Sequence, residues 1–514
     1  VKKAKDYKNR PYPYTKWYPE HMASESELEQ QRKTPFAYAP LISIVIPLYN
    51  TPVPYLKELL DSVQAQTYPN FQLCLADGSD NSRTGDYIRE NYETDKRIQY
   101  KLLENNAGIS ENTNEAIKMA TGEFIMFSDH DDTLAPNALF EIVKEMNENP
   151  GTDVVYTDED KVTMDGKRYF DPHFKPDFNL DMLRCNNYIC HIFVVKREIL
   201  ERVGMLRKEF DGAQDFDFIL RCCEKAENIR HVAKILYHWR NHPASTAGNP
   251  ESKMYAYEAG RNAVQAHYDR IGMKAEVSMT EQWGRYRTKL FVEGEPLVTI
   301  IIPNKDHKKE LKTCVDSLFE KTSYQNFEIL IIENNSTGKE IFAYYKELEA
   351  AHENVRVLIW EKEFNYSAIN NFGAEHARGE YLLLLNNDIE VKTENWMEEM
   401  LSYCQREDVG IVGAKLLFPN EKIQHAGVIL GMGPSGTAGH LFYNFPRDQF
   451  VYAGRSQTTQ DLSAVTAACM MVKKELYQKV GGMDEAFQVA FNDIDFNLKL
   501  LEKGYYNVCL NHVE

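Results

Sequence analysis

The sequence predicts an α/β fold in which a doubly wound, mainly parallel sheet occurs twice along the chain. Short β-branched runs alternate with amphipathic segments of helical period, and several of these runs end in acidic residues. The same series of strand-end motifs returns in the second half of the 514 residues. We therefore expect an N-terminal arm over residues 1–38 and two tandem domains over residues 39–285 and 290–514.

The N-terminal arm is polar and rich in aromatic residues. Ser24 or Ser26 could cap a short helix that runs through Gln31. Five basic residues fall within the first ten positions, so this end could touch an anionic membrane surface. The alternative is an arm that is solvated or packed on another part of the protein.

The first domain is expected to open with a buried parallel strand at residues 41–47, LISIVIP. A loop and an amphipathic helix follow, because Leu56, Leu59, Leu60 and Val63 recur at helical spacing. The other expected elements are strands at residues 71–77, 97–105 and 123–127 and a helix at residues 110–122 that ends at a glycine.

Three carboxylates, Asp129, Asp131 and Asp132, follow the strand at residues 123–127 within four positions. Acids at the end of such a strand face the carboxyl edge of the sheet, where α/β proteins bind their ligands. Like charges this close need a positive partner, and a hard divalent cation such as Mn²⁺ or Mg²⁺ is the candidate. The alternative is an acidic turn in which Asp131 or Asp132 caps the helix that begins near Pro136.

The strand-end motifs of the first half return in the second half in register, which predicts a duplicated domain. The matched pairs are Pro47 and Pro303, Asp77 and Glu333, Asp129 and Asn386, and Asp131 and Asp388. Of the three clustered acids, only Asp131 is matched by an acid in the second half, so this residue is the expected metal ligand. Asp132, which is matched by Ile389, is the better candidate for a helix cap.

Each half also carries a later Asp-x-Asp ahead of an apolar helix, with Asp215 in the first and Asp493 in the second. Asp77, at the end of the second strand, can accept hydrogen bonds from a base or ribose. A nucleotide diphosphate and its metal would fill the space between Asp131 and Asp215. Asp215 would then act as general base for an incoming hydroxyl. A base and a metal-held leaving group on opposite sides of one sugar carbon invert that carbon.

Two further segments carry candidate functional residues. In YHWRNHPAST, His238 and His242 lie four residues apart, and both could reach a metal if the segment were helical. Pro243 and the Ser and Thr that follow favour a loop, and a structural histidine is the alternative. The second half contains a Gly-rich insertion, QHAGVILGMGPSGTAGH, at residues 424–440. A flexible segment of this kind could form a lid or an acceptor loop, or be plain surface.

Composition excludes several classes of protein. The formal net charge of −18 argues against a nucleic-acid partner, which needs a basic surface. The nine cysteines are scattered without a CxxC pair, which indicates reduced thiols and a cytoplasmic setting. No apolar run has the length of a membrane span, and no signal-peptide pattern is present.

Both halves resemble family-2 glycosyltransferases of the GT-A fold. The first half does so through PLYN, ADGSD, ATGEFIMFSDHDD and QDFD, and the second through IIIPNKD, IENNST, FNYSAINNFGA, LLLLNNDIEV and FNDIDF. The motifs are specific as a set, although each alone is weak. Tandem proteins of this kind are similar to bacterial rhamnan, O-antigen and capsule glycosyltransferases.

The resemblance implies metal-dependent, inverting transfer from UDP- or dTDP-sugars, with dTDP-rhamnose as one candidate. The implied acceptor is a growing cell-surface polysaccharide, lipid-linked at the inner membrane face. The implied bases are Asp215 and Asp493, and the implied metal ligands are Asp129, Asp131, His238 and Asp388. The implied nucleotide-sugar contacts are Pro47, Tyr49, Asn50, Asp77, Asp129, Pro303, Glu333 and Asn386.

The second half departs from the family pattern. It offers one carboxylate in Asn386-Asn387-Asp388, so it should bind a cation more weakly. The late histidine of the family would lie beyond Glu514, so we expect this domain to be truncated. The alternative function is therefore a catalytic first domain beside a scaffold that only binds nucleotide or glycan. Nucleotidyltransferases and dinucleotide oxidoreductases would need Gly-rich loops after the first strand, and the sequence shows none there.

Overall fold

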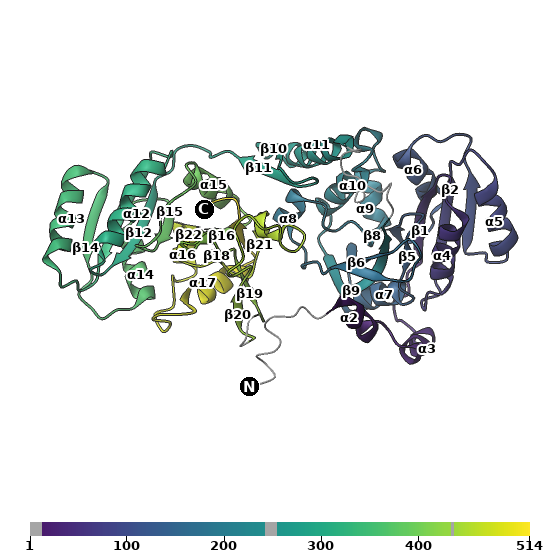
Figure 1. Ribbon diagram of the computed structural model, residues 1–514, viewed down its shortest axis with the longest axis horizontal. Helices are drawn as coiled ribbons and strands as arrows, with labels where there is room; N and C mark the ends of the chain where they lie inside the picture. The colour runs from purple at the N-terminus through teal and green to yellow at the C-terminus, as the bar shows by residue number, and fades with distance from the viewer. Residues whose placement is uncertain (1–12, 242–253, 433–435) are drawn as a thin grey trace. The chain divides into compact units, whose positions relative to one another are not determined.

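The computed structural model describes residues 13–241, 254–432 and 436–514 (Figure 1). The chain divides into two compact units, each built on a large mixed sheet with helices. The first unit holds residues up to 178, 186–273 and 277–286, and the second holds 179–185, 274–276 and 287–514. Two sheets of this kind confirm the predicted α/β class and its duplication, while the domain boundaries drawn from the sequence stay a prediction.

The first unit is organised by a sheet of order β3-β2-β1-β4-β8-β6-β9-β5, with β7 paired to β6. Strand β1 pairs in parallel with β2 and β4, and β8 runs antiparallel between β4 and β6. The strands are β1 (Ile42–Leu48), β2 (Phe71–Asp77), β3 (Ile98–Leu102), β4 (Phe124–Phe127), β5 (Thr133–Leu134), β6 (Val154–Val162), β7 (Tyr169–His173), β8 (Phe193–Lys196) and β9 (Ile229–Arg240).

Helices complete the first unit, and the apolar face of α4 (Val53–Gln64) joins its core as predicted. Leu56, Leu59, Leu60 and Val63 are fully buried in one cluster with side chains of β1 and β2. The other helices are α2 (Tyr14–His21), α3 (Glu25–Lys33), α5 (Arg83–Tyr92), α6 (Ile109–Met119), α7 (Ala138–Glu148), α9 (Arg197–Val203), the 3-10 turn η1 (Lys208–Phe210), α10 (Gln214–Cys223) and α11 (Met254–Ile271).

The described part of the N-terminal arm packs on the first unit. Ser24 caps α3 in a capping box with Glu27, as predicted. The hydroxyl of Tyr18 lies 3.0 Å from His238 Nε2, so α2 is tied to β9. The basic residues of the first ten positions lie outside the described residues, and their contact with a membrane stays a prediction.

The helix predicted to end at Gly122 ends earlier, at Met119. A Cβ on Gly122 would lie 2.6 Å from the carbonyl oxygen of Leu41, so this glycine allows β4 to begin beside β1. In the second unit, a Cβ on Gly379 would lie at the same distance, 2.6 Å, from the carbonyl oxygen of Leu297. The two glycines therefore have the same role in both sheets, which is to allow two strands to approach closely, and they are not helix caps.

The second unit repeats the first sheet with the order β14-β13-β12-β15-β22-β16-β23-β21. Strand β12 pairs in parallel with β13 and β15, and β22 runs antiparallel between β15 and β16, which are the senses found in the first unit. The strands are β12 (Val298–Asn304), β13 (Phe327–Glu333), β14 (Val355–Ile359), β15 (Tyr381–Leu385), β16 (Val409–Ala414), β21 (Gln460–Asp461), β22 (Cys469–Lys473) and β23 (Tyr506–Leu510).

The remaining elements of the second unit include the predicted insertion. The insertion holds the paired strands β19 (Val428–Leu430) and β20 (Ala438–His440) and the end of β18 (Ile423–His425), which pairs with β17 (Leu416–Leu417) before it. The helices are α8 (Leu180–Cys185), α12 (Lys308–Lys321), α13 (Lys339–Ala351), α14 (Tyr366–His376), α15 (Trp396–Cys404), the 3-10 turn η3 (Arg455–Gln457), α16 (Lys474–Lys479) and α17 (Asn492–Leu501). Strands β10 (Ala275–Met279) and β11 (Tyr286–Leu290) form a hairpin at the junction of the two units.

A helix that crosses a membrane must be both long and apolar. Across the described ranges, no helix has both the length and the apolar character of a membrane span.

Candidate active site

The predicted site residues of the first unit gather at the carboxyl edge of its parallel strands. Leu48, the last residue of β1, is level with Asp77, the last residue of β2. Strand β4 ends at Phe127, directly before the acidic segment, and Ser128 donates its backbone N–H to Val45 of β1. The edge thus brings Asp77 and the acidic segment to one side of the sheet, which is the side where α/β proteins bind ligands.

Asp77 and Glu333 hold the same position in the two units and make the same kind of internal contact. The Asp77 carboxylate is fully buried and accepts hydrogen bonds from the Ser79 backbone N–H (2.9 Å) and the Tyr100 hydroxyl (2.8 Å). Glu333 is also buried and accepts one from the Tyr345 hydroxyl at 2.6 Å. Both acids therefore close the turn after the second strand, and their contact with a nucleoside stays a prediction.

The loop after β1 is bound to the turn after β2. The Tyr49 hydroxyl donates to Asp80 at 3.1 Å, and the Asn50 side-chain amide donates to the same carboxylate at 3.3 Å. Pro47 and Pro303 lie inside their strands, paired with the residues before Asp77 and Glu333. This arrangement places exposed polar groups at the sheet edge, while the nucleotide contacts of these residues stay predictions.

The acidic segment divides into one inward and two outward carboxylates. Asp132 is fully buried and accepts hydrogen bonds from the Tyr237 hydroxyl (2.6 Å) and the Arg240 backbone N–H (2.7 Å) of β9. The predicted cap is wrong, because the residue before α7 is Asn137 and its side chain makes no capping hydrogen bond. Pairing with β9 draws Asp132 into the core instead.

Asp129 and Asp131 are the carboxylates at the surface of this edge. Asp129 lies 3.4 Å from His191 Nε2, and Asp131 is half-buried. No lysine or arginine in the part of the chain that the structure describes forms an ion pair with Asp131. Carboxylate oxygens at a sheet edge suit a hard cation such as Mn²⁺ or Mg²⁺, which a diphosphate would help to hold. Within the described ranges, no three His, Cys, Asp or Glu side chains already form a complete metal site.

His238 lies next to the acidic segment in the sheet, but its side chain points elsewhere. Successive strand residues face opposite sides, so Tyr237 contacts Asp132 while His238 faces the other way. His238 Nδ1 lies 2.6 Å from Asp160 Oδ1, and His238 Nε2 is hydrogen-bonded to the Tyr18 hydroxyl. Metal ligation by His238 would require Tyr18 to move, and it stays a prediction. His242 lies outside the described residues.

Asp215 stands in the first turn of α10 and is held from a distant segment. The side-chain amide of Asn187 donates to Asp215 Oδ2 at 2.8 Å. Burial raises the pKa of Asp215 above the usual aspartate range, the Asp129 charge adds to the rise, and His191 opposes it. The charges of Asp129 and His191 therefore act on Asp215, while its role as a base stays a prediction.

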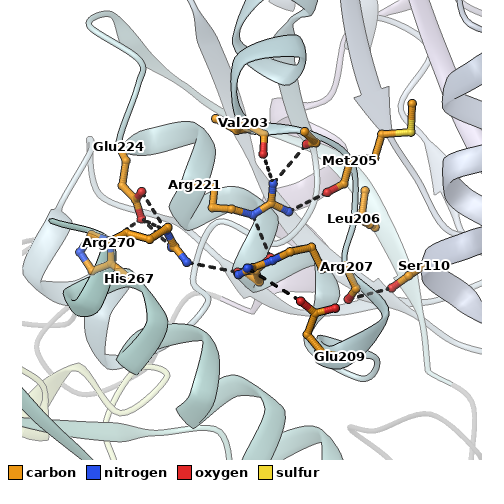
Figure 2. A network of polar contacts seen from close by, with 12 residues as sticks. Ser110, Val203, Met205, Leu206, Arg207, Glu209, Arg221, Glu224, His267 and Arg270 are labelled. Atoms are coloured by element: carbon orange, nitrogen blue, oxygen red, sulfur yellow. Dashed lines mark hydrogen bonds and ion pairs between the residues drawn. The ribbon is translucent and has the colours of Figure 1, made fainter.

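The neighbouring acid, Asp217, has a structural role. Its side chain is fully buried and bonds to Arg207 (3.1 Å) and Arg221 (2.9 Å), with Arg270 at 3.6 Å. Figure 2 shows these three guanidinium groups converging from the α9–η1 segment, α10 and α11. The network fixes α10, and with it the position of Asp215.

The second unit arranges its counterparts differently. Asp493, in the first turn of α17, accepts hydrogen bonds from the backbone N–H of Ala467 (3.3 Å) and of the next residue in the helix (2.9 Å). The Tyr366 hydroxyl donates to Asn386 (3.2 Å), and Asp388 is exposed. The acid and amide positions of the repeat are thus present, with a single carboxylate in the NND segment.

Sequence reasoning missed the residues that support the predicted acids. Asn187, His191, Tyr237 and Tyr366 contact Asp215, Asp129, Asp132 and Asn386, respectively. Their partners lie from about 20 to more than 100 residues away, so no local spacing could reveal them. Tyr366 and Tyr237 had a signal, because they lie in the motifs FNYSAINN and YHWRNHPAST.

Comparison with known proteins gives relatives over both halves of the chain. "Uncharacterized protein y4gI" of Sinorhizobium fredii is 42% identical over 474 residues, which are 91% of this chain and 52% of the relative. "O-antigen biosynthesis protein RfbC" of Myxococcus xanthus is 39% identical over 472 residues, which are 91% of this chain and 36% of the relative. This chain thus spans about half the length of the first relative and about a third of the second.

Solved structures are more distant. S. aureus TarS in complex with UDP-GlcNAc is 22% identical, with a TM-score of 0.36, over 44% of this chain and 66% of that chain. The mannosyltransferase PcManGT of Pyrobaculum calidifontis, with GDP-Man and Mn²⁺, is 16% identical, with a TM-score of 0.32, over 42% of this chain and 54% of that chain. The family described as "Glycosyl transferase family 2" matches residues 43–204 and 299–481, one segment in each half. The chain therefore belongs to glycosyl transferase family 2.

Proposed function

We propose that the chain transfers sugars from nucleotide diphosphate sugars to a growing bacterial cell-surface polysaccharide, inverting the anomeric carbon. The observation that carries this proposal is the first site itself. There, no lysine or arginine of the described ranges pairs with the Asp131 carboxylate, and Asn187 holds Asp215, whose pKa responds to Asp129 and His191. The Myxococcus xanthus relative is named for O-antigen biosynthesis, which supports a polysaccharide product. The donor is proposed to be a UDP- or dTDP-sugar, and the acceptor a lipid-linked glycan at the cytoplasmic face of the membrane.

Each residue of the first site has a proposed task. Asp215 accepts the proton of the acceptor hydroxyl, and Asn187 keeps its carboxylate turned toward that hydroxyl. Asp131 and Asp129 hold the cation, with His238 as a further proposed ligand. A divalent cation bound there would neutralise charge on the leaving diphosphate. Tyr49, Asn50 and Asp77 are proposed to border the nucleoside.

Replacement of the proposed metal ligand should separate binding from folding. We expect Asp131→Ala to weaken Mn²⁺ binding by about tenfold or more, since it removes a charged oxygen ligand. Electron paramagnetic resonance titration of Mn²⁺ measures this directly, and release of sugar from a UDP- or dTDP-sugar donor measures its consequence. The variant should unfold like the wild type, because Asp131 makes no ion pair with a lysine or arginine in the described part of the chain.

Asp171→Ala is the matched control for this experiment. Asp171 is an acid of the same unit whose side chain is 63% exposed and pairs with Lys161 at the surface. Its replacement should leave Mn²⁺ binding and donor turnover unchanged. Equal Mn²⁺ affinity in Asp131→Ala and the wild type would remove Asp131 from the metal site.

The pH dependence of the first site should show the raised pKa of Asp215. A base works only when deprotonated, so transfer should fall as pH drops through a pKa that lies above the usual aspartate range. Asn187→Ala should move this acid limb to higher pH, because it removes a hydrogen bond that favours the charged carboxylate. The measurement is kcat/KM against pH in an Asp493→Asn background. An acid limb that stays in place in Asn187→Ala contradicts the assigned contact.

A second candidate function applies to the second unit. Its NND segment is partly used inside the protein, because the Asn387 side-chain amide donates to Asn304 (2.6 Å) and Asn386 accepts from Tyr366 (3.2 Å). Only Asp388 then offers a charged oxygen, which favours a scaffold that binds nucleotide or glycan without transfer. Asp493→Asn tests this candidate: an unchanged product would support a scaffold, and loss of a linkage would support a second active site.

A further inference from the structure

The insertion of the second unit contains two histidines, His425 and His440, close to the segment formed by Thr466 and Ala467, which also binds Asp493. The Thr466 backbone N–H donates to His425 Nε2 at 3.3 Å, and the next amide, of Ala467, donates to Asp493 at 3.3 Å. His425 Nδ1 lies 2.9 Å from His440 Nδ1. The His425–His440 pair is therefore attached to the same short segment as the proposed base.

These contacts fix which nitrogen of each ring carries a proton. His425 is buried, and burial together with the charge of His440 lowers its pKa to about 3. The neutral ring accepts at Nε2, so its proton is on Nδ1 and is donated to His440 Nδ1. Burial also lowers the pKa of His440, which leaves a neutral ring with its proton on Nε2. His440 thus offers an N–H donor at the surface, in the field of Asp493.

An exposed aromatic ring continues from this pair. The ring centroid of Tyr443 lies 6.5 Å from that of His440, and Tyr443 forms a T-shaped contact with Phe418, at 5.5 Å and 85°. Its side chain is nevertheless 56% exposed. An exposed aromatic ring that is held by a neighbouring ring is a suitable platform for the C–H face of a sugar.

The loop before α17 adds apolar surface on the chain segment that carries the base. Phe487, Val489 and Phe491 are exposed, at 37%, 75% and 51%. The exposed acids Asp484 and Glu485 precede them, which disfavours an anionic membrane as the partner. Aromatic rings beside a directed N–H donor and a carboxylate favour a hydroxyl-rich ligand with apolar faces.

We propose that His440 and Tyr443 form the acceptor-glycan subsite of the second unit, with Tyr443 stacking on a sugar ring and His440 Nε2–H bonding to a hydroxyl. The proposal rests on the proposed function, because it takes Asp493 as the base that the acceptor hydroxyl must reach. It assigns a specific task to an insertion that the first unit lacks.

The experiment measures glycan binding to the full chain without any donor. Saturation-transfer NMR with methyl trisaccharides of rhamnose, glucose and N-acetylglucosamine avoids a probe with an aromatic ring of its own. Tyr443→Ala should weaken binding about tenfold, as expected for one lost stacking contact, whereas Tyr443→Phe should stay within about twofold. His440→Ala should also weaken binding, and His440→Gln, which keeps an N–H donor, should restore part of it.

Phe342→Ala is the matched control, since it removes an exposed ring (38%) from α13, which packs near β14 at the other edge of the second sheet (Figure 1). It should bind glycan like the wild type. Unchanged glycan affinity in a folded Tyr443→Ala variant overturns the proposal, and so does a wild type that binds none of the trisaccharides. If Tyr443→Ala kept its glycan affinity and lost only binding to vesicles of phosphatidylethanolamine and phosphatidylglycerol, the surface would be a membrane contact. This result would also overturn the proposal.

Failure of the proposed function gives a different result. The wild type would then turn over no nucleotide sugar, while glycan binding would still be lost in Tyr443→Ala. The two hypotheses are therefore separated by comparing donor turnover with glycan affinity on the same protein samples.

Discussion

Asp215→Asn should abolish sugar transfer by the first site, lowering kcat by about 10²–10⁴-fold, the usual contribution of a general base. The amide is nearly isosteric with the carboxylate but cannot take the proton of the acceptor hydroxyl. Donor KM should change much less than kcat, because the proposed cation and nucleoside contacts come from other residues and Asp215 is assigned to the acceptor hydroxyl. The measurement is steady-state transfer in an Asp493→Asn background, so that only the first site contributes.

The control for this prediction is a variant that weakens the base without removing it. Asn187→Ala frees the Asp215 carboxylate and shifts its pKa, so its rate loss should shrink as pH rises. The loss in Asp215→Asn should persist at every pH. Transfer by Asp215→Asn within about tenfold of the unaltered site would place the base elsewhere in the first unit.

The sequence alone could predict the sheet and its duplication because both depend on local patterns. Strand runs, the apolar face of α4 and the strand-end acids recur at fixed spacing, and the structure places Asp77 and Glu333 at equal positions in their sheets. These features need only periodicity and register.

The orientation of single side chains could not be predicted in this way. His238 and Tyr237 are adjacent in the sequence, yet opposite faces of β9 give them different partners. Asp132 looked like a cap because its repeat partner is apolar, but its real partners come from β9. Likewise, the contact of Asn187 with Asp215 joins segments that no spacing rule connects. Such contacts are set by tertiary packing.

Asp217→Ala should destabilise the first unit by about 3–5 kcal/mol, the usual cost of removing one partner from a buried ion pair. The Asp217 side chain is fully buried, and its removal leaves Arg207 and Arg221 without their shared carboxylate. Arg270 keeps Glu224 at 2.6 Å, and Arg221 keeps three backbone carbonyl groups, so the network would be weakened and not emptied. Urea unfolding followed by circular dichroism measures the change.

Asp495→Ala in the second unit provides the matched comparison, because it removes the acid at the same motif position. Asp495 is 28% exposed and pairs with Lys499 at 3.0 Å, one turn along α17, so its loss should cost only about 0.5 kcal/mol or less. Asp215→Asn should leave unfolding of the first unit unchanged, although it removes activity. Asp217→Ala should therefore lower sugar transfer because α10, which carries Asp215, is no longer held in place. Conditions that stabilise the fold should restore part of the activity. Equal stability of the Asp217→Ala and Asp495→Ala variants would show that the buried arginine network does not hold α10.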